Sequence, residues 1–300
     1  MRGWRRSSLW CGHDRRTRQI GQAVTLAMEN AGVLDPQGPV ALAERTMLFN
    51  ATAIMLAVIL PVIILTLATA WWFRAGNAKA RYLPDWEYSG RVELVVWAVP
   101  ALVIMFLGGI AWIGSHQVDP YAPLVSDAQP VDVEVVSLDW KWLFIYPEQG
   151  VASVGRLTIP AGRPIRFRLT SATVMNSFLV PQLGSQIYTM AGMVTRLSLQ
   201  ADRPGRYPGL SAQFSGSGFS DMRFEVEAVP DREFDEWVSR TRAGPDALDQ
   251  AAYAALAKPG TAEAPRAFAS VSPGLFEAIV GGDGGMMGSV ASTSSHAQAH

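Results

Sequence analysis

Two long apolar runs constrain this chain more than any other feature. The stretch 47–70, MLFNATAIMLAVILPVIILTLATA, has no charged residue, and the stretch 92–113 has only Glu93. At a rise of about 1.5 Å per residue, each run is long enough to cross the hydrocarbon core of a bilayer, about 30 Å thick. The two runs therefore predict a transmembrane hairpin. A cleaved signal peptide does not fit the first run, which begins too far along the chain and is too long.

The distribution of basic residues predicts how the hairpin is oriented. The segment between the two runs holds Arg74, Lys79, Arg81 and Arg91, and no Lys or Arg follows the second run before Lys141. Because basic loops stay on the cytoplasmic side, both termini are expected on the outer side of the membrane. The arginine-rich residues 1–30 fit this orientation only as a leader region. Whether the leader is cleaved stays open.

Composition limits the chemistry available outside the membrane. The net charge is −1, which gives no electrostatic case for binding nucleic acid. One cysteine allows neither a disulfide framework nor a two-cysteine metal site. No Cys or His occurs between residues 118 and 295, so that stretch cannot hold a Ser-His-Asp triad. We therefore predict no catalytic residue in this chain. Its Cys and His residues are Cys11, His13, His116, His296 and His300.

After residue 130 the apolar pattern changes to the period of a β-strand. The segments 131–138, 165–170, 195–199 and 223–229 each alternate apolar and polar residues, and Gly, Pro, Asn and Ser separate them. This pattern predicts an antiparallel sandwich or barrel of about 100 residues. The residues beyond 230 have helical spacing. The last twenty are of low complexity; a flexible tail is favoured over a weak Met/His copper site.

The predicted architecture is a mixed membrane protein. An N-terminal two-helix transmembrane hairpin precedes an antiparallel β-sandwich or barrel, and short C-terminal helices follow it. The predicted segments are a leader (1–30), an outer N-terminal segment (31–46), the first transmembrane helix (47–73), a cytoplasmic loop (74–91), the second transmembrane helix (92–114), a linker (115–130), a periplasmic β-domain (131–230), a C-terminal helical arm (231–280) and a disordered tail (281–300).

Three stretches carry a family resemblance. SLDWKWLFIYPEQG (137–150), SATVMNSFLVPQLGSQIYTMAGM (171–193) and SAQFSGSGFSDMRFEV (211–226) resemble subunit II of cytochrome bo-type ubiquinol oxidases, in the haem–copper oxidase superfamily. The resemblance extends over about residues 34–276 and implies that the β-domain is cupredoxin-like. The family's subunit II usually carries a lipid-modified Cys just before an "LLDP"-like sequence. Here that region reads MENAGVLDP, without Cys, which puts lipid anchoring in doubt.

The resemblance also implies that a copper site has been lost. Relatives that oxidise cytochrome c hold two coppers through a His of an "HSF" motif and a Cys-Cys-His-Met loop with a bridging Glu carbonyl. In this chain Asn176 stands at the first His, Phe214 at the first Cys, Gly216 at the Glu and Gly218 near the second Cys; only Met222 matches. A mixed-valence copper pair needs bridging thiolates, so no metal is expected here. Phe214 is expected to fill by packing the space that metal and thiolate occupy elsewhere.

The implied function is that of a supporting subunit. The chain would be subunit II of a respiratory, proton-pumping ubiquinol oxidase in the bacterial inner membrane, without a catalytic centre of its own. Its implied partners are subunit I, which would hold the haems, one copper and the ubiquinol site, together with small oxidase subunits and lipid. A cytochrome c oxidase subunit II is the rival within the family. The rival from another class is a free-standing, membrane-anchored periplasmic binding or sensor module.

Three residues have two interpretations each. On the sequence alone, Glu93 is equally well a proton-transferring carboxylate or an interfacial residue facing cytoplasmic water. The resemblance favours the first, because RVELVVWAVP matches the start of the family's second span, where a Glu sits at the mouth of the K proton channel. Trp140 and Trp142 match aromatic residues near the electron-entry patch of the cytochrome c enzymes. Without copper beneath them, packing in the core or at an interface is favoured.

Overall fold

The computed structural model describes residues 32–81, 83–85, 87–260 and 264–282. They fall into two compact units, one spanning 42–122 and the other comprising the described residues up to 41 and from 123 onward. The predicted leader and most of the predicted tail lie outside the described residues.

The first unit is built on two long helices. Helix α2 (Pro39–Trp72) and helix α3 (Gly90–Gln117) are each long and apolar enough to cross a membrane. Helix α2 begins eight residues before the apolar run, because Pro39 has the fixed φ that suits a first helical turn and Ala, Leu and Glu follow it. Pro61 and Pro100 lie inside the helices. At Gly114, an added Cβ would lie 1.9 Å from Met47 Sδ, so the two helices of this unit approach closely there.

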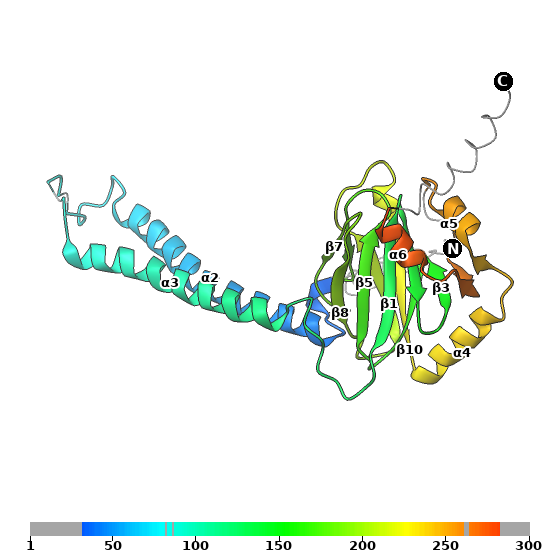
Figure 1. Ribbon diagram of the computed structural model, residues 1–300. Helices are drawn as coiled ribbons and strands as arrows, with labels where there is room; N and C mark the ends of the chain where they lie inside the picture. Colours follow the sequence, from blue (N-terminus) through cyan, green and yellow to red (C-terminus); the bar gives the residue numbers. More distant parts are fainter. Residues whose placement is uncertain (1–31, 82, 86, 261–263, 283–300) are drawn as a thin grey trace, which may run out of the picture. The chain divides into compact units, whose positions relative to one another are not determined.

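The outer unit is a sandwich of two sheets, as predicted (Figure 1). The first sheet has the order β12-β3-β2-β1-β5-β8 and the second has the order β4-β10-β9-β6-β7. Two pairs, β1 with β5 and β10 with β4, run parallel; the other pairs in these two sheets are antiparallel. The strands are β1 (Val131–Leu138), β2 (Lys141–Tyr146), β3 (Val151–Val154), β4 (Arg156–Pro160), β5 (Ile165–Ser171), β6 (Asn176–Leu179), β7 (Ile187–Thr189), β8 (Thr195–Leu199), β9 (Gly205–Ser211), β10 (Arg223–Val229) and β12 (Arg266–Phe268).

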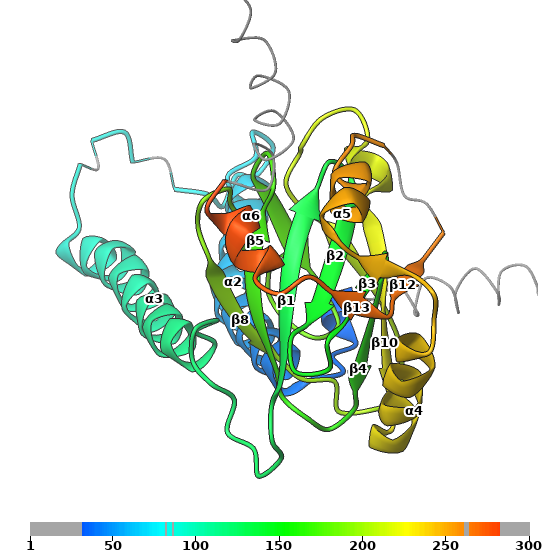
Figure 2. The same ribbon diagram turned by 45° about the vertical axis from the view of Figure 1, so that its right-hand side comes forward.

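The segment predicted as a helical arm contains strands as well as helices. Its helices are α4 (Asp231–Arg242), α5 (Gln250–Leu256) and α6 (Leu275–Val280), and the short strands β11 (Ala247–Leu248) and β13 (Ser270–Val271) pair with each other. Strand β12 joins the first sheet beside β3. In both views α6 lies across β1 and β5 (Figures 1 and 2). The short C-terminal helices are as predicted, whereas the strands between them were not foreseen, because strands of two or three residues carry no periodic signal.

Two hydrophobic clusters lie on the two faces of the first sheet. The larger fills the sandwich between the sheets and includes Trp142, Phe144, Phe178 and Phe224. The second lies between the other face of the sheet and the C-terminal arm, and includes Leu143, Ile145, Leu256 and Phe276. Because both faces of β2 are covered, all six of its residues are buried. The buried Lys141 of this strand donates hydrogen bonds from Nζ to the carbonyl oxygens of Leu256 and Lys258, at the C-terminal end of α5, where a cation is favoured.

Candidate functional site

The loop between β9 and β10, residues 212–222, is the candidate site that the sequence singled out. Its base is closed by hydrogen bonds from Ser211 N to Met222 O (3.1 Å) and from Ala212 N to Ser177 O (3.0 Å). A short 3-10 helix, η2 (Phe219–Asp221), precedes Met222. Gly216 has a φ of 111°, a conformation that residues with a Cβ rarely adopt. The Gly/Ser composition therefore serves the shape of the loop.

Trp140 is the residue that packs against the loop. It is the second residue of the two-residue connection between β1 and β2, and its φ of 66° is the only positive value among the described non-glycine residues. Its indole Nε1 donates a hydrogen bond to Ser215 O (3.1 Å). A Cβ added at Gly218 would lie 2.3 Å from the indole ring, and one at Gly216 would lie 3.2 Å from it. Gly218 is thus needed for the close approach of the indole, and Gly216 leaves room beside it.

Phe214 does not fill the space that was assigned to it. Its side chain is 72% exposed and touches the ring of Phe219 edge-on, with 5.6 Å between centroids. The expectation that Phe214 packs in place of metal and thiolate was therefore wrong. The loop turns the Phe214 side chain outward, and Trp140, which is distant in the sequence, covers the two glycines instead. Neither feature can be predicted from the position of Phe214 in the sequence.

Asn176 and Met222, the two candidate residues whose side chains could bind a metal, are both buried. Asn176 is buried; its Nδ2 donates to Val174 O (3.1 Å), and its Oδ1 accepts from Ser211 Oγ (3.3 Å). Met222 is 1% exposed and belongs to the main core. Its Sδ lies 3.9 Å from Ser215 Oγ. Both side chains thus take part in local hydrogen bonds or core packing.

Aromatic side chains pack beneath the loop. Trp142 is buried and meets Phe178 edge-on, with 5.5 Å between ring centroids. Phe178 stacks on Phe224 at 5.0 Å, and Phe224 in turn lies against Gly209, where an added Cβ would be 2.2 Å from the ring. Trp142 is therefore a core residue, in line with the packing interpretation of this aromatic pair.

The donor set of the loop does not fit a copper pair. The whole stretch from 118 to 295 contains neither Cys nor His, and bridging thiolates are what holds a mixed-valence pair together. In the part of the chain that the structure describes, no cluster of three or more His, Cys, Asp and Glu side chains could hold a metal ion. One thioether and one hydrogen-bonded amide are what remain at the matched positions.

Glu93, the candidate proton-entry residue, lies in the first turn of α3, and its side chain is exposed. Its backbone N–H donates to the carbonyl oxygen of Ser89, the N-cap residue (3.0 Å). A carboxylate in the first turn of a helix is stabilised by the helix dipole. Glu93 thus stands at the start of the apolar run, in the turn where α3 begins.

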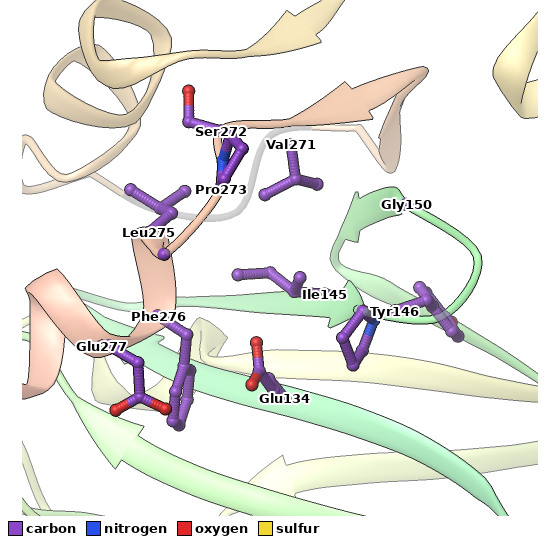
Figure 3. Close-up of a pocket in the computed structure, with 12 residues that line it drawn as sticks. Glu134, Ile145, Tyr146, Gly150, Val271, Ser272, Pro273, Leu275, Phe276 and Glu277 are labelled. Carbon is purple, nitrogen blue, oxygen red and sulfur yellow. The ribbon is translucent and has the colours of Figure 1, made fainter.

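A cavity on the other side of the domain was not foreseen from the sequence. It has a volume of about 280 Å³ and lies between β1, β2 and the segment that leads into α6. Figure 3 shows Glu134 of β1 pointing into it, with Phe276 and Glu277 of α6 nearby. Burial raises the pKa of the Glu134 carboxyl above its ordinary value, and the neighbouring Arg168 opposes this rise.

Arg168 of β5 connects β1 and α6, which form two walls of this cavity. Its guanidinium donates to Glu134 Oε1 (2.7 Å) and to Glu277 Oε1 (2.6 Å), and it lies 4.9 Å from the centre of the Phe276 ring. The alternation of β5 placed Arg168 on the polar face, but no local pattern signalled a partner 109 residues away. The arrangement attaches α6 to the sheet and contains no acid–base pair free to act on a substrate.

The chain is similar to known proteins over most of its length. Two family models match: cytochrome c oxidase subunit II, periplasmic domain, over residues 126–229, and the COX aromatic rich motif over residues 242–282. The cytochrome bo(3) ubiquinol oxidase subunit 2 of Pseudomonas aeruginosa is 50% identical over 261 residues, which are 87% of this chain and 79% of that protein. The ubiquinol oxidase subunit 2 of Acetobacter aceti is 48% identical over 264 residues, 87% of this chain and 85% of that protein.

One solved structure is similar to part of this chain. The periplasmic domain of subunit II of cytochrome oxidase from Bradyrhizobium japonicum matches 39% of this chain and 96% of its own length, with 23% sequence identity and a TM-score of 0.36.

Proposed function

The chain belongs to the family of ubiquinol oxidase subunit 2, and on this premise we propose that it is the supporting, non-catalytic second subunit of a proton-translocating quinol oxidase. The observation that carries the proposal is the state of the loop 212–222. Trp140 covers Gly216 and Gly218. The stretch from 118 to 295 contains neither the Cys nor the His ligands that a copper pair needs. A domain with these residues has no means of accepting electrons from cytochrome c through copper.

Ubiquinol fits such a subunit, because a lipid-soluble reductant delivers electrons from within the membrane. The quinol site, the haems and one copper then belong to the partner subunit, and the β-domain supports the complex on the periplasmic side. The two apolar helices of the first unit support attachment to the inner membrane. The free-standing binding or sensor module is the alternative, and it predicts a chain that is stable without such a partner.

The test is purification of the oxidase through a tag on the full-length chain, in a mild detergent. We expect a haem-bearing partner with many transmembrane helices, quinol oxidase activity, and one copper ion per complex. Two further copper ions per chain would contradict the loss of the copper site. Recovery of the chain alone, without haem, would favour the binding or sensor module.

We further propose that Glu93 collects protons at the mouth of the K channel. It is the only charged residue of the run 92–113 and is exposed in the first turn of α3. An ionisable group within an apolar membrane segment is a candidate functional group, commonly for proton transfer. In this role Glu93 exchanges protons with water and passes them toward the partner subunit.

Replacing Glu93 by Gln or Ala should lower quinol oxidase turnover severalfold, because neither side chain can take up and release a proton. Haem content and assembly should stay normal, and Glu93→Asp should recover part of the rate. Glu87→Gln, which removes an exposed carboxylate from the preceding loop, is the matched control and should leave turnover unchanged. Equal turnover in assembled Glu93→Gln and control complexes would rule the proton role out.

A further inference from the structure

The turn that follows α2 forms a concave basic surface. A cavity of about 560 Å³ is lined there by Arg74, Asn77 and Arg81, together with Phe73 and Leu83. Phe73 and Leu83 are 60% and 61% exposed, so the cavity offers apolar surface beside its cationic groups. All of these residues belong to the unit that contains the two long apolar helices.

Local hydrogen bonds shape the turn and neutralise the end of the helix. Arg74 Nη1 donates to Trp71 O (3.0 Å), and its guanidinium lies 4.8 Å from the centre of the Trp71 ring. Asn77 Nδ2 donates to Trp72 O (2.6 Å). These donors reach the last carbonyl groups of α2, which carry the negative end of the helix dipole and would otherwise repel an anion. A guanidinium has five N–H donors, so Arg74 keeps donors for a ligand.

The positive charges of this loop are not matched within the described chain. None of Arg74, Lys79, Arg81 and Arg91 forms an ion pair with a described carboxylate, although Asp85 and Glu87 lie in the same loop. By contrast, most ion pairs of the outer domain join neighbouring strands or an arginine to the C-terminal arm. The loop therefore has donors to offer to an external anion.

The apolar helix places this surface at the level of lipid headgroups. Helix α2 ends with Trp71 and Trp72, 64% and 46% exposed, directly before the cavity. Exposed Trp side chains at the end of an apolar span lie in the interfacial layer of a membrane. Basic residues in that layer attract anionic lipids, and the neighbouring apolar side chains meet the glycerol and the upper acyl chain.

We propose that this turn is a binding site for the phosphate headgroup of an anionic phospholipid, held by Arg74 and Arg81. The guanidinium groups pair with the phosphate oxygens, as arginine does in phosphate recognition generally. The proposal rests on insertion of the two helices in a membrane and does not depend on the oxidase role of the chain. The same phosphate chemistry is offered by free phosphate, so the test separates the two sources.

The test is native mass spectrometry of the full-length chain in detergent, titrated with phosphatidylglycerol and with phosphatidylcholine of the same acyl chains. The wild-type chain should bind phosphatidylglycerol at least about tenfold more tightly, which is the preference expected from two interfacial arginines. The double variant Arg74→Gln/Arg81→Gln should lose this preference. Arg74→Lys/Arg81→Lys should keep part of it, because it preserves the charges but not the paired N–H donors of the guanidinium.

The matched control is Arg196→Gln/Arg223→Gln, which removes two exposed arginines from the outer domain and should keep the preference. Circular dichroism of each variant checks that the helices are intact. No preference in the wild-type chain, or an unchanged preference in Arg74→Gln/Arg81→Gln, would overturn the site. Displacement of phosphatidylglycerol by millimolar inorganic phosphate would assign the site to a free anion and overturn the lipid assignment.

Discussion

Replacing Phe178 by alanine should lower the free energy of unfolding of the outer domain by about 3–5 kcal/mol, the range for large aromatic side chains in a closely packed core. Phe178 is fully buried, and its ring meets Trp142 edge-on at 5.5 Å, Phe167 at 5.5 Å and Phe224 at 5.0 Å. Because the neighbours are themselves large rings held by two sheets, they cannot close the cavity that alanine leaves. Chemical unfolding of the full-length chain in detergent, followed by tryptophan fluorescence, measures the loss.

Phe214→Ala is the matched control for this experiment, since it removes the same ring from the candidate loop. Phe214 is 72% exposed, so its replacement should change the free energy of unfolding by less than about 0.5 kcal/mol. A large loss in Phe214→Ala would mean that this ring packs in the domain after all. A small loss in Phe178→Ala would contradict the description of the aromatic core beneath the loop.

Replacing Gly38 by valine should detach the segment that precedes α2 from the outer domain. A Cβ at Gly38 would lie 2.1 Å from the backbone oxygen of Gln200, which cannot move away as a flexible side chain can. The flanking hydrogen bonds, from Gln37 N to Gln182 O (2.7 Å) and from Asp202 N to Gln37 O (2.8 Å), depend on the same close approach. Overpacking and the loss of these bonds together should cost about 3 kcal/mol.

Hydrogen exchange measures this prediction at the two amides concerned. The N–H groups of Gln37 and Asp202 should lose their protection in Gly38→Val, while amides in the middle of β1 keep theirs. Gly76→Val is the control, because a Cβ at Gly76 has no atom within 4 Å. Unchanged protection of Gln37 and Asp202 in the Gly38 variant would show that the segment is not held as described.

The sequence predicted strands that keep at least part of one face toward water. The segments 131–138, 195–199 and 223–229 alternate in the sequence and are strands with these bounds in the structure. Strand β2 gave no alternation, because the core and the C-terminal arm cover its two faces and all six residues are buried. Alternation of apolar and polar residues indicates a strand with one face in water. It is absent where a segment distant in the sequence covers the second face.

The sequence placed the candidate loop between two strands, as in the structure, but it did not predict how the loop packs. Absence of Cys and His is a property of the sequence, so the loss of the thiolate and imidazole ligands could be read directly. The left-handed backbone conformation of Trp140 cannot be predicted from the sequence. It places the indole ring against the glycines of a loop about 75 residues away. The role of Glu93 stays a prediction, since it depends on a partner chain.

The second cluster on the first sheet determines how much of the chain a soluble fragment needs. If the chain ended at residue 230, where the sandwich pattern stops, the face that carries Leu143, Ile145 and Val154 would meet water. An uncovered apolar face of this kind promotes self-association. A fragment meant to stay monomeric outside the membrane must therefore run through α6. Loss of the segment beyond α4 would remove the cover of this face together with the edge strand β12, and the remaining sandwich would be prone to aggregation.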